Sequence, residues 1–221
     1  AFRLSTLFPD WDSSVFDAHK DWLVPHYVNP KKMTALLNMH SWVLQYDGRT
    51  ILVDTCIGND KDRMPAEKWH QVRSPYLERL AQAGFQPEDI DMVMCTHLHV
   101  DHVGWNTRLV DGRWVPTFPN AKYIFSRTEF EHFQENAADM DRISFGDSVL
   151  PIVEHGLAEM TNGNHALGEG ILVQPAPGHT PGHITLTLET GDDAAIFTGD
   201  ILHHPLQILY PNWKAITNIN L

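Results

Sequence analysis

Four potential metal ligands follow directly after a short apolar segment of the chain. The segment Asp91–Cys95 (DMVMC) predicts a buried strand, and the sequence THLHVDHVG continues from it. Residues two apart in an extended chain project to the same side, so His97 and His99 can aim both imidazoles at one ion. Asp101 and His102 are adjacent, and after a turn they can reach a second ion. Solvated loops have no reason to concentrate imidazoles, and the pattern therefore predicts a metal site at a strand end.

Two later motifs carry the same type of chemistry. The sequence PGHTPGH lies between predicted strands over 171–174 and 184–188, and its glycines and prolines can hold His179 rigidly in a turn. We interpret His183, which begins the next strand, as a structural residue. Asp200 ends the sequence FTGD after a predicted strand over 194–197. A carboxylate has two oxygens and can bridge two cations, which suits Asp200 to a position between two ions.

Composition narrows the chemistry further. The chain has 221 residues, 43% of them hydrophobic, which is enough for one sizeable core. It contains 14 histidines, and imidazole is the commonest metal ligand. The two cysteines, Cys56 and Cys95, lie in apolar contexts and are interpreted as buried, inert thiols. Their number excludes a disulfide framework, and zinc-finger spacing is absent, so His and carboxylates must hold any metal.

The remaining patterns predict a mixed α/β domain. Asp47-Gly48 is a hairpin signal between two apolar runs. Ser126 followed by Glu129 predicts a capping box that opens a helix to about residue 136. Further strands are expected over 41–46, 50–53 and 121–125, and further helices over 66–83, ending at Gly84, and 148–154. We divide the chain into an irregular N-terminal arm, residues 1–38, and a domain over 39–221.

The order THxHxDH, then GHTPGH, then TGD resembles the metallo-β-lactamase superfamily of hydrolases over roughly residues 35–205. This resemblance implies an αββα sandwich, with two mixed β-sheets flanked by helices and the metals at the edge between the sheets. It implies that the first metal is held by His97, His99 and His179, that the second is held by Asp101 and His102, and that Asp200 bridges them. Asp54 matches a family acid that orients a ligand His from outside the metal's coordination sphere.

The sequence departs from the family pattern at two places. The family often has Gly where this chain has Cys56. It also supplies one more His to the second metal, well downstream of the bridging Asp, whereas His203 and His204 follow Asp200 too closely to match it. We therefore expect that a C-terminal segment with this His is missing and that the domain over 39–221 is incomplete at its C-terminus.

The arm, Trp105 and the sequence GDILHH resemble most the lactonase, arylesterase and methyl parathion hydrolase-like branch. In that branch His203 would lie near the substrate pocket, and Trp42 and Trp105 are further candidate pocket residues. Two divalent ions, zinc first and manganese, iron or cobalt as alternatives, would share a water and lower its pKa. The resulting hydroxide would attack an ester, lactone or phosphotriester. Asp101 and Asp200 are the candidate catalytic residues, since they position the ions and can carry the proton.

Several alternatives stay open. A glyoxalase II-like thioesterase shares both His motifs, a single-iron redox protein would keep the fold, and a catalytically silent metal-binding or interaction module is a further reading. A true β-lactamase is disfavoured by Asp200. The 16 basic and 28 acidic residues give a formal net charge of -12, which disfavours nucleic acid and an anionic substrate. We expect a neutral, apolar small-molecule substrate.

The sequence gives less guidance on where the protein acts. It contains no run of 18 apolar residues, so we expect no membrane partner. The first residues, AFRLSTLFPDW, lack the pattern of a signal peptide, which favours a cytoplasmic over a secreted protein and leaves localisation open. The arm over 1–38 is a candidate for exchange between the subunits of a homodimer.

Overall fold

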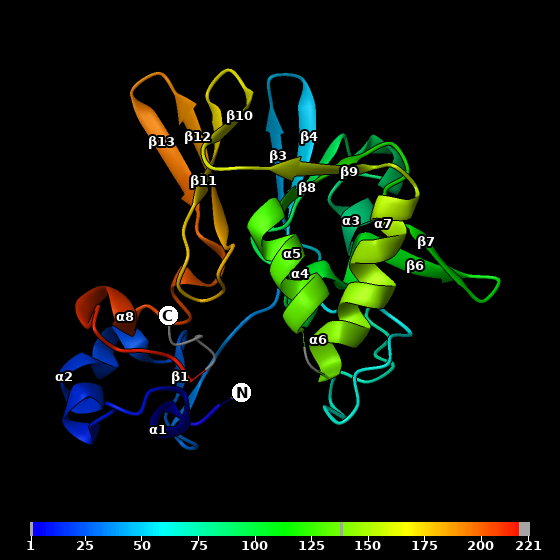
Figure 1. Cartoon of the computed structure of the whole chain (residues 1–221). Coiled ribbons are helices and arrows are strands. Elements are labelled where there is room, and N and C mark those ends of the chain that lie inside the picture. Colours follow the sequence, from blue (N-terminus) through cyan, green and yellow to red (C-terminus); the bar gives the residue numbers. More distant parts are fainter. Residues whose placement is uncertain (1, 138, 217–221) are drawn as a thin grey trace. The chain divides into compact units, whose positions relative to one another are not determined.

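The computed structural model describes residues 2–137 and 139–216, which divide into two units (Figure 1). The larger unit comprises Met39–Pro177 and Pro181–Gly199. The smaller unit comprises Ala1–Asn38, Gly178–Thr180 and Asp200–Leu221.

A five-stranded mixed sheet forms the centre of the larger unit, in the order β3-β4-β5-β8-β9. Its strands are β3 (Trp42–Tyr46), β4 (Arg49–Val53), β5 (Met92–Met94), β8 (Lys122–Ser126) and β9 (Ala158–Thr161). β3 and β4 are antiparallel and turn at Asp47 and Gly48, whose φ values of 51° and 70° suit the predicted two-residue hairpin. The other neighbours are parallel, so the chain leaves β4, β5 and β8 at the same edge.

A second sheet of four antiparallel strands packs against the first. It contains β10 (His165–Gly168), β11 (Ile171–Pro175), β12 (Ile184–Thr190) and β13 (Asp193–Phe197), in that order. Alternate residues of β4 and β5, such as Ile51 and Met94, face Val173 and Leu186 in one buried cluster between the sheets. This alternation follows from the two-residue period of a strand.

Helices cover the opposite face of the five-stranded sheet (Figure 1). They are α3 (Tyr76–Gln82), α5 (Arg127–Asn136), α6 (Asp139–Ser144), the π-helix η3 (Phe145–Val149) and α7 (Leu150–Glu154). Leu52 and Val93, which point away from the second sheet, pack in one cluster with Leu80 of α3, Phe133 of α5 and Ile152 of α7. The predicted arrangement of two sheets with flanking helices is confirmed, but only the first sheet is mixed, because every pairing in the second sheet is antiparallel.

The prediction of a helix over 66–83 was wrong for its first half. α3 begins only at Tyr76, and the residues before it form separate turns. Pro75 lacks an amide hydrogen and cannot continue the hydrogen-bond ladder of a helix, and it is the N-cap residue directly before α3. The end was correct, since Gly84 follows α3 with a φ of 95°. The hairpin of β6 (Thr107–Val110) and β7 (Arg113–Pro116) was not predicted, although Asp111-Gly112 between the two strands is the same type of turn signal as Asp47-Gly48.

The smaller unit has regular structure where an irregular arm was predicted. It contains α1 (Leu4–Leu7), α2 (Ser13–Leu23), β1 (Val28–Asn29), β2 (Thr34–Ala35) and α8 (Leu206–Leu209). Asp12 caps α2 by accepting a hydrogen bond from the Ser14 N–H at 2.8 Å, a signal that the sequence contained. Leu4, Phe8 and Leu206 belong to its fully buried core.

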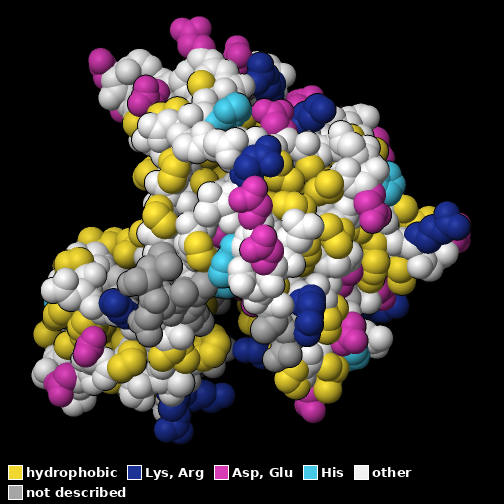
Figure 2. Space-filling view, viewed as in Figure 1, with side chains coloured by type: hydrophobic (Ala, Val, Ile, Leu, Met, Phe, Trp, Pro, Cys, Tyr) yellow, Lys and Arg dark blue, Asp and Glu magenta, His cyan; other side chains and the backbone are white. Residues whose placement is uncertain are grey.

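Two features of the described residues bear on partners. On the face drawn in Figure 2, most Lys and Arg side chains lie among Asp and Glu, and a few lie together at the lower edge of the view. None of the helices within the described residues is long and apolar enough to cross a membrane.

A buried ion-pair network holds the loop that follows β4. Arg63 and Lys61 have no exposed surface, and both reach Asp147 of η3. Arg63 donates two hydrogen bonds to the Asp147 carboxylate, at 2.7 and 2.9 Å, and Lys61 Nζ donates to the Thr107 hydroxyl and to the Asp147 carbonyl. Burial lowers the pKa of Lys61 to about 7, against the opposing effect of Asp147. The Asp147 carboxylate is the counter-charge of the buried Arg63 guanidinium.

We expect Asp147→Ala to lower the free energy of unfolding by about 3–5 kcal/mol, because it leaves a buried guanidinium without a carboxylate. Glu135→Ala is the matched control, since Glu135 is exposed on α5, and its effect should stay within about 0.5 kcal/mol. Urea unfolding of both variants measures the difference. A loss below about 1 kcal/mol in Asp147→Ala would contradict the role given to this network.

Candidate metal centre

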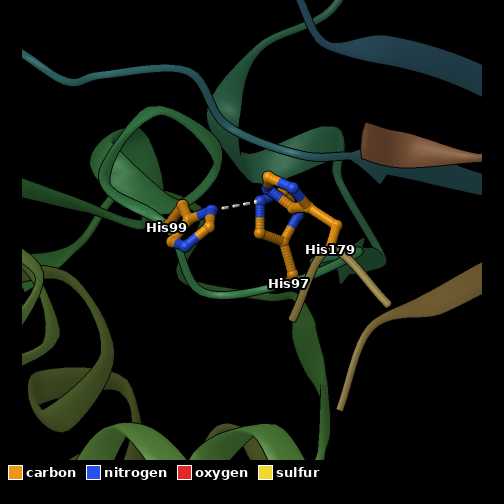
Figure 3. Close-up of side chains that lie close together, drawn as sticks. All are labelled: His97, His99 and His179. Atoms are coloured by element: carbon orange, nitrogen blue, oxygen red, sulfur yellow. Dashed lines mark hydrogen bonds between the residues drawn. The ribbon is translucent and has the colours of Figure 1, made fainter. Parts of the chain in front are cut away.

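The first motif leaves β5 and gathers three imidazoles. His97 is buried, and its Nε2 lies 3.0 Å from Nδ1 of His99, the contact dashed in Figure 3, which also draws His179. The short helix α4 (Val100–Val103) then turns the chain. This turn returns the His102 ring to within 4.0 Å of the His97 ring, centroid to centroid. The structure therefore brings together His97, His99 and His102 as the sequence predicted.

Asp54 fixes the orientation of His102. Its carboxylate accepts hydrogen bonds from the Thr96 N–H at 2.7 Å and from the Thr96 hydroxyl at 2.8 Å, and it lies 2.8 Å from His102 Nδ1. A carboxylate only accepts, so Nδ1 carries a proton, and in the neutral ring the lone pair is then on Nε2. That Nε2 lies 3.8 Å from a carboxylate oxygen of Asp101. Asp54 has the geometry that a support for a ligand imidazole requires.

Left-handed backbone brings the Asp54 loop against the turn of α4. Asp54 and Cys56 have φ values of 56° and 51°, which explains why glycine suits the position of Cys56 in the family. The Thr55 N–H donates to the His102 carbonyl, and the Gly104 N–H donates to the Cys56 carbonyl, both at 2.7 Å. A Cβ at Gly104 would lie 1.9 Å from the backbone of Ile57, so only glycine permits this approach.

The two thiols remain protonated at neutral pH. Burial raises the pKa of Cys56 to about 11, and burial also raises the pKa of Cys95. In the metal-free chain neither cysteine therefore supplies a thiolate nucleophile at neutral pH.

The second and third motifs meet the first at Thr96, within the larger unit. The Ile184 N–H at the start of β12 donates to the Thr96 carbonyl at 2.8 Å, and the His183 ring stacks on the His97 ring at 5.0 Å. Gly199 follows β13 with a φ of 52°, and a Cβ there would lie 2.6 Å from the Thr96 hydroxyl. Two further segments therefore meet at the end of β5. One is the segment at His183, four positions after the predicted ligand His179, and the other is Gly199, directly before the predicted ligand Asp200.

The smaller unit brings together His179, Asp200 and His203. One oxygen of Asp200 lies 3.6 Å from His179 Nε2 and 3.3 Å from His203 Nε2. The ligand atoms of all three residues lie within 4.8 Å of one another and could hold a metal ion. The sequence had placed His203 only near a pocket. Its neighbour His204 is different: its Nε2 lies 3.0 Å from the Tyr27 carbonyl, and burial lowers its pKa.

The two candidate pocket tryptophans have different surroundings. Trp105 is 6% exposed and stacks on Tyr76 at 5.1 Å, which makes it part of the packing behind α4. Trp42 is 52% exposed, and its ring meets that of Phe197 edge-on at 5.8 Å.

The donor set fits divalent ions of the zinc type. Imidazole nitrogen and carboxylate oxygen are ligands that zinc, manganese, iron and cobalt accept. The carboxylates of Asp101 and of Asp141, which lies on α6, repel each other when no cation is bound. Burial, and then the charge of Asp101, raise the pKa of Asp141 to about 6. A divalent ion bound at Asp101 would relieve this repulsion.

The sequence profile of the metallo-beta-lactamase superfamily matches residues 36–218 of this chain. The chain belongs to this superfamily. Superfamily membership supports metal-dependent hydrolysis in general, and every metal ligand predicted from the sequence lies inside the matched region.

Two curated relatives illustrate the range of similarity. An N-acyl homoserine lactonase of a Bacillus species is 32% identical over 111 residues, which are 50% of this chain and 38% of the relative. A probable metallo-hydrolase of Mycobacterium tuberculosis is 24% identical over 202 residues, 81% of this chain and 62% of the relative. The chain therefore spans less than two thirds of the length of either relative.

Two solved structures share the fold of this chain. The hydrolase AbOPH of the beta lactamase superfamily has a TM-score of 0.77 and 24% identity, and the match covers 99% of this chain and 74% of that one. AidC, a dizinc quorum-quenching lactonase solved with a product, has a TM-score of 0.69 and 20% identity, over 97% of this chain and 72% of that one.

We expect Asp54→Asn to weaken zinc binding by about 10- to 100-fold, because the amide turns a donor toward His102 Nδ1 and disturbs the tautomer that leaves Nε2 unprotonated. Competition with a chromophoric chelator measures the affinity. Asp91→Asn is the matched control, since Asp91 also accepts a backbone N–H, that of Thr50, near the opposite end of β4. Equal zinc affinity in both variants would remove Asp54 from the metal centre.

Proposed function

We propose that this chain carries the dinuclear metal centre of a hydrolase that cleaves an ester, lactone or phosphotriester bond, with esters and lactones as the first expectation. The observation that carries the proposal is the donor set of the superfamily motifs. His97, His99 and His102 gather in the larger unit, and His179, Asp200 and His203 gather in the smaller one.

We assign the first metal to His97, His99 and His179, the second to Asp101 and His102, and the bridge to Asp200. Two contacts support the assignment. Asp54 holds His102 so that Nε2 is available, and this nitrogen already faces Asp101. Asp200 lies within 4 Å of His179 and so has the separation that two ligands of one ion can adopt. Zinc is the first expectation, with manganese, iron or cobalt as alternatives.

When bound, a pair of divalent ions lowers the pKa of a water to near neutrality and polarises the bond under attack. The residues of this chain orient the reactants and carry the proton. Asp101 and Asp200 are carboxylates at the ligand cluster and can accept the proton of the attacking water. His203, beside Asp200, can hold that carboxylate in place. The described chemistry needs no Ser or Cys nucleophile, and burial keeps both thiols protonated.

Two observations support a neutral substrate such as a lactone. Proteins that resemble this chain are named as lactonases, in Bacillus and among the solved structures. The formal net charge of -12 disfavours an anionic substrate in the approach to the site. A glutathione thioester, the expected substrate of the thioesterase alternative, carries negative charge. The tryptophan with the larger exposed surface, Trp42, could contact an apolar part of the substrate.

Hydrolysis of four substrates, each with and without a chelator, tests the proposal. The set comprises a medium-chain lactone, an aryl ester, a phosphotriester and a glutathione thioester. We expect the lactone or the ester to be turned over and the chelator to abolish turnover, with zinc restoring it. Turnover of the thioester alone would favour the glyoxalase II-like alternative. Stoichiometric metal without turnover of any substrate would favour a silent metal-binding module.

A ligand substitution should remove activity without removing the fold. We expect His97→Ala to lower kcat/KM by more than about 100-fold, the upper end of the loss seen when only an outer partner of a ligand is removed. His165→Ala is the control, because His165 pairs with Glu159 at the surface on β10. Retention of chelator-sensitive turnover in His97→Ala would contradict the proposed ligand set.

A further inference from the structure

A buried carboxylate of α5 joins the backbones of the two His motifs. Glu129 is 1% exposed, and its two oxygens accept different amides: the Leu98 N–H at 3.2 Å and the Gly182 N–H at 2.8 Å. Leu98 stands between His97 and His99 in the first motif. Gly182 stands directly before His183 in the second motif. One side chain therefore ties together two loops that lie more than 80 positions apart in the sequence.

The sequence predicted another role for this residue. A capping box would turn the carboxylate of Glu129 back toward the start of its own helix. In the structure the Ser126 hydroxyl does accept the Glu129 N–H, at 3.4 Å, so the N-cap forms as predicted. The carboxylate, however, accepts from the two His motifs, 31 and 53 residues away.

The surroundings of Glu129 explain how a buried charge is tolerated. The residue lies in the first turn of α5, where the free N–H groups and the helix dipole favour a negative charge. Hydrogen bonds from amides to an ionised carboxylate are also stronger than those between neutral groups. The free-energy cost of desolvating the Glu129 carboxylate is thus partly offset by the N–H groups of Leu98 and Gly182, which must both stay in place.

Helix α5 packs closely against both His motifs. A Cβ at Gly182 would lie 2.1 Å from the Glu129 nitrogen, so the second motif can approach the helix only with glycine at this position. One turn further along α5, the Phe133 ring meets the His99 ring edge-on at 5.8 Å. Residues four apart lie on one helix face, so Glu129 and Phe133 form a single surface behind the ligands.

We propose that Glu129 is a positioning residue that sets the separation of the two His motifs and thereby the affinity of the metal centre. The inference rests on the proposed function, because it assumes that both motifs supply ligands. Glu129 touches neither substrate nor metal in this role. It acts through Leu98, which stands between the predicted ligands His97 and His99, and through Gly182, which follows the predicted ligand His179 by three positions.

Glu129→Gln is the sharpest test, because it keeps the size of the side chain and removes one acceptor. The amide has one oxygen for two N–H groups, and its NH₂ must face the second of them. Glu131→Gln is the matched control, since Glu131 is exposed on the same helix. We expect Glu129→Gln to bind zinc about 10- to 100-fold more weakly than the parent chain, as for other groups that orient metal ligands. Glu131→Gln should bind zinc like the parent.

Two further measurements separate positioning from a general loss of stability. Zinc affinity is measured by chelator competition well below the Tm of each variant, and the visible spectrum of the Co²⁺-substituted protein reports the ligand geometry. Amide hydrogen exchange on the metal-free protein should be faster at Leu98 and Gly182 in Glu129→Gln alone. A lower Tm together with parent-like zinc affinity and cobalt spectrum would overturn the proposal and leave Glu129 a structural residue.

The outcome also distinguishes this inference from the proposed function. If the parent chain binds neither zinc nor cobalt, the proposed function fails, and the positioning role fails with it. If the parent binds metal and Glu129→Gln binds it equally well, only the positioning role fails. Should Glu129→Gln not fold, Gly182→Ala presses on the same junction from the other side, and parent-like zinc affinity in that variant would overturn the proposal.

Discussion

The ligand-bearing loops depend on a buried hydrogen-bond junction at Thr96, the residue that follows β5 by two positions. Its N–H and hydroxyl both donate to Asp54, and its carbonyl accepts the N–H of Ile184. Gly199 packs against its side chain. Loops from both sheets are therefore fixed to one residue by bonds that water cannot easily replace, because the junction is buried.

Two buried carboxylates extend this junction in opposite directions. Asp54 holds Thr96 and His102 from the side of β4, and Glu129 holds Leu98 and Gly182 from the side of α5. Asp54 ties the start of the first motif to its end, and Glu129 ties the first motif to the second, so a shift of either motif leaves a buried carboxylate poorly bonded. Such a cost restricts motion of the imidazoles before any ion is bound, which is the preorganisation that a catalytic metal site needs.

The sequence was most informative where the chemistry is local. The residues of the first motif lie within six positions, and their order alone predicted that His97, His99 and His102 would gather. The hairpin before Asp54 was predicted correctly for the same reason. Contacts between distant segments carried no local signal: the sequence showed neither that Glu129 reaches Gly182 nor that Arg63 is buried against an acid 84 positions away. The start of the helix predicted over 66–83 was wrong for a local reason, because the prediction overlooked Pro75.

The central claim is that both groups of ligands serve one pair of metal ions. A crystal of the chain grown with zinc, measured at the zinc absorption edge, tests it most directly. The account predicts two anomalous peaks per chain, about 3.5–4 Å apart, one bound by His97, His99 and His179, the other bound by Asp101 and His102, and Asp200 in contact with both. A single peak, or zinc bound by other residues, would contradict it.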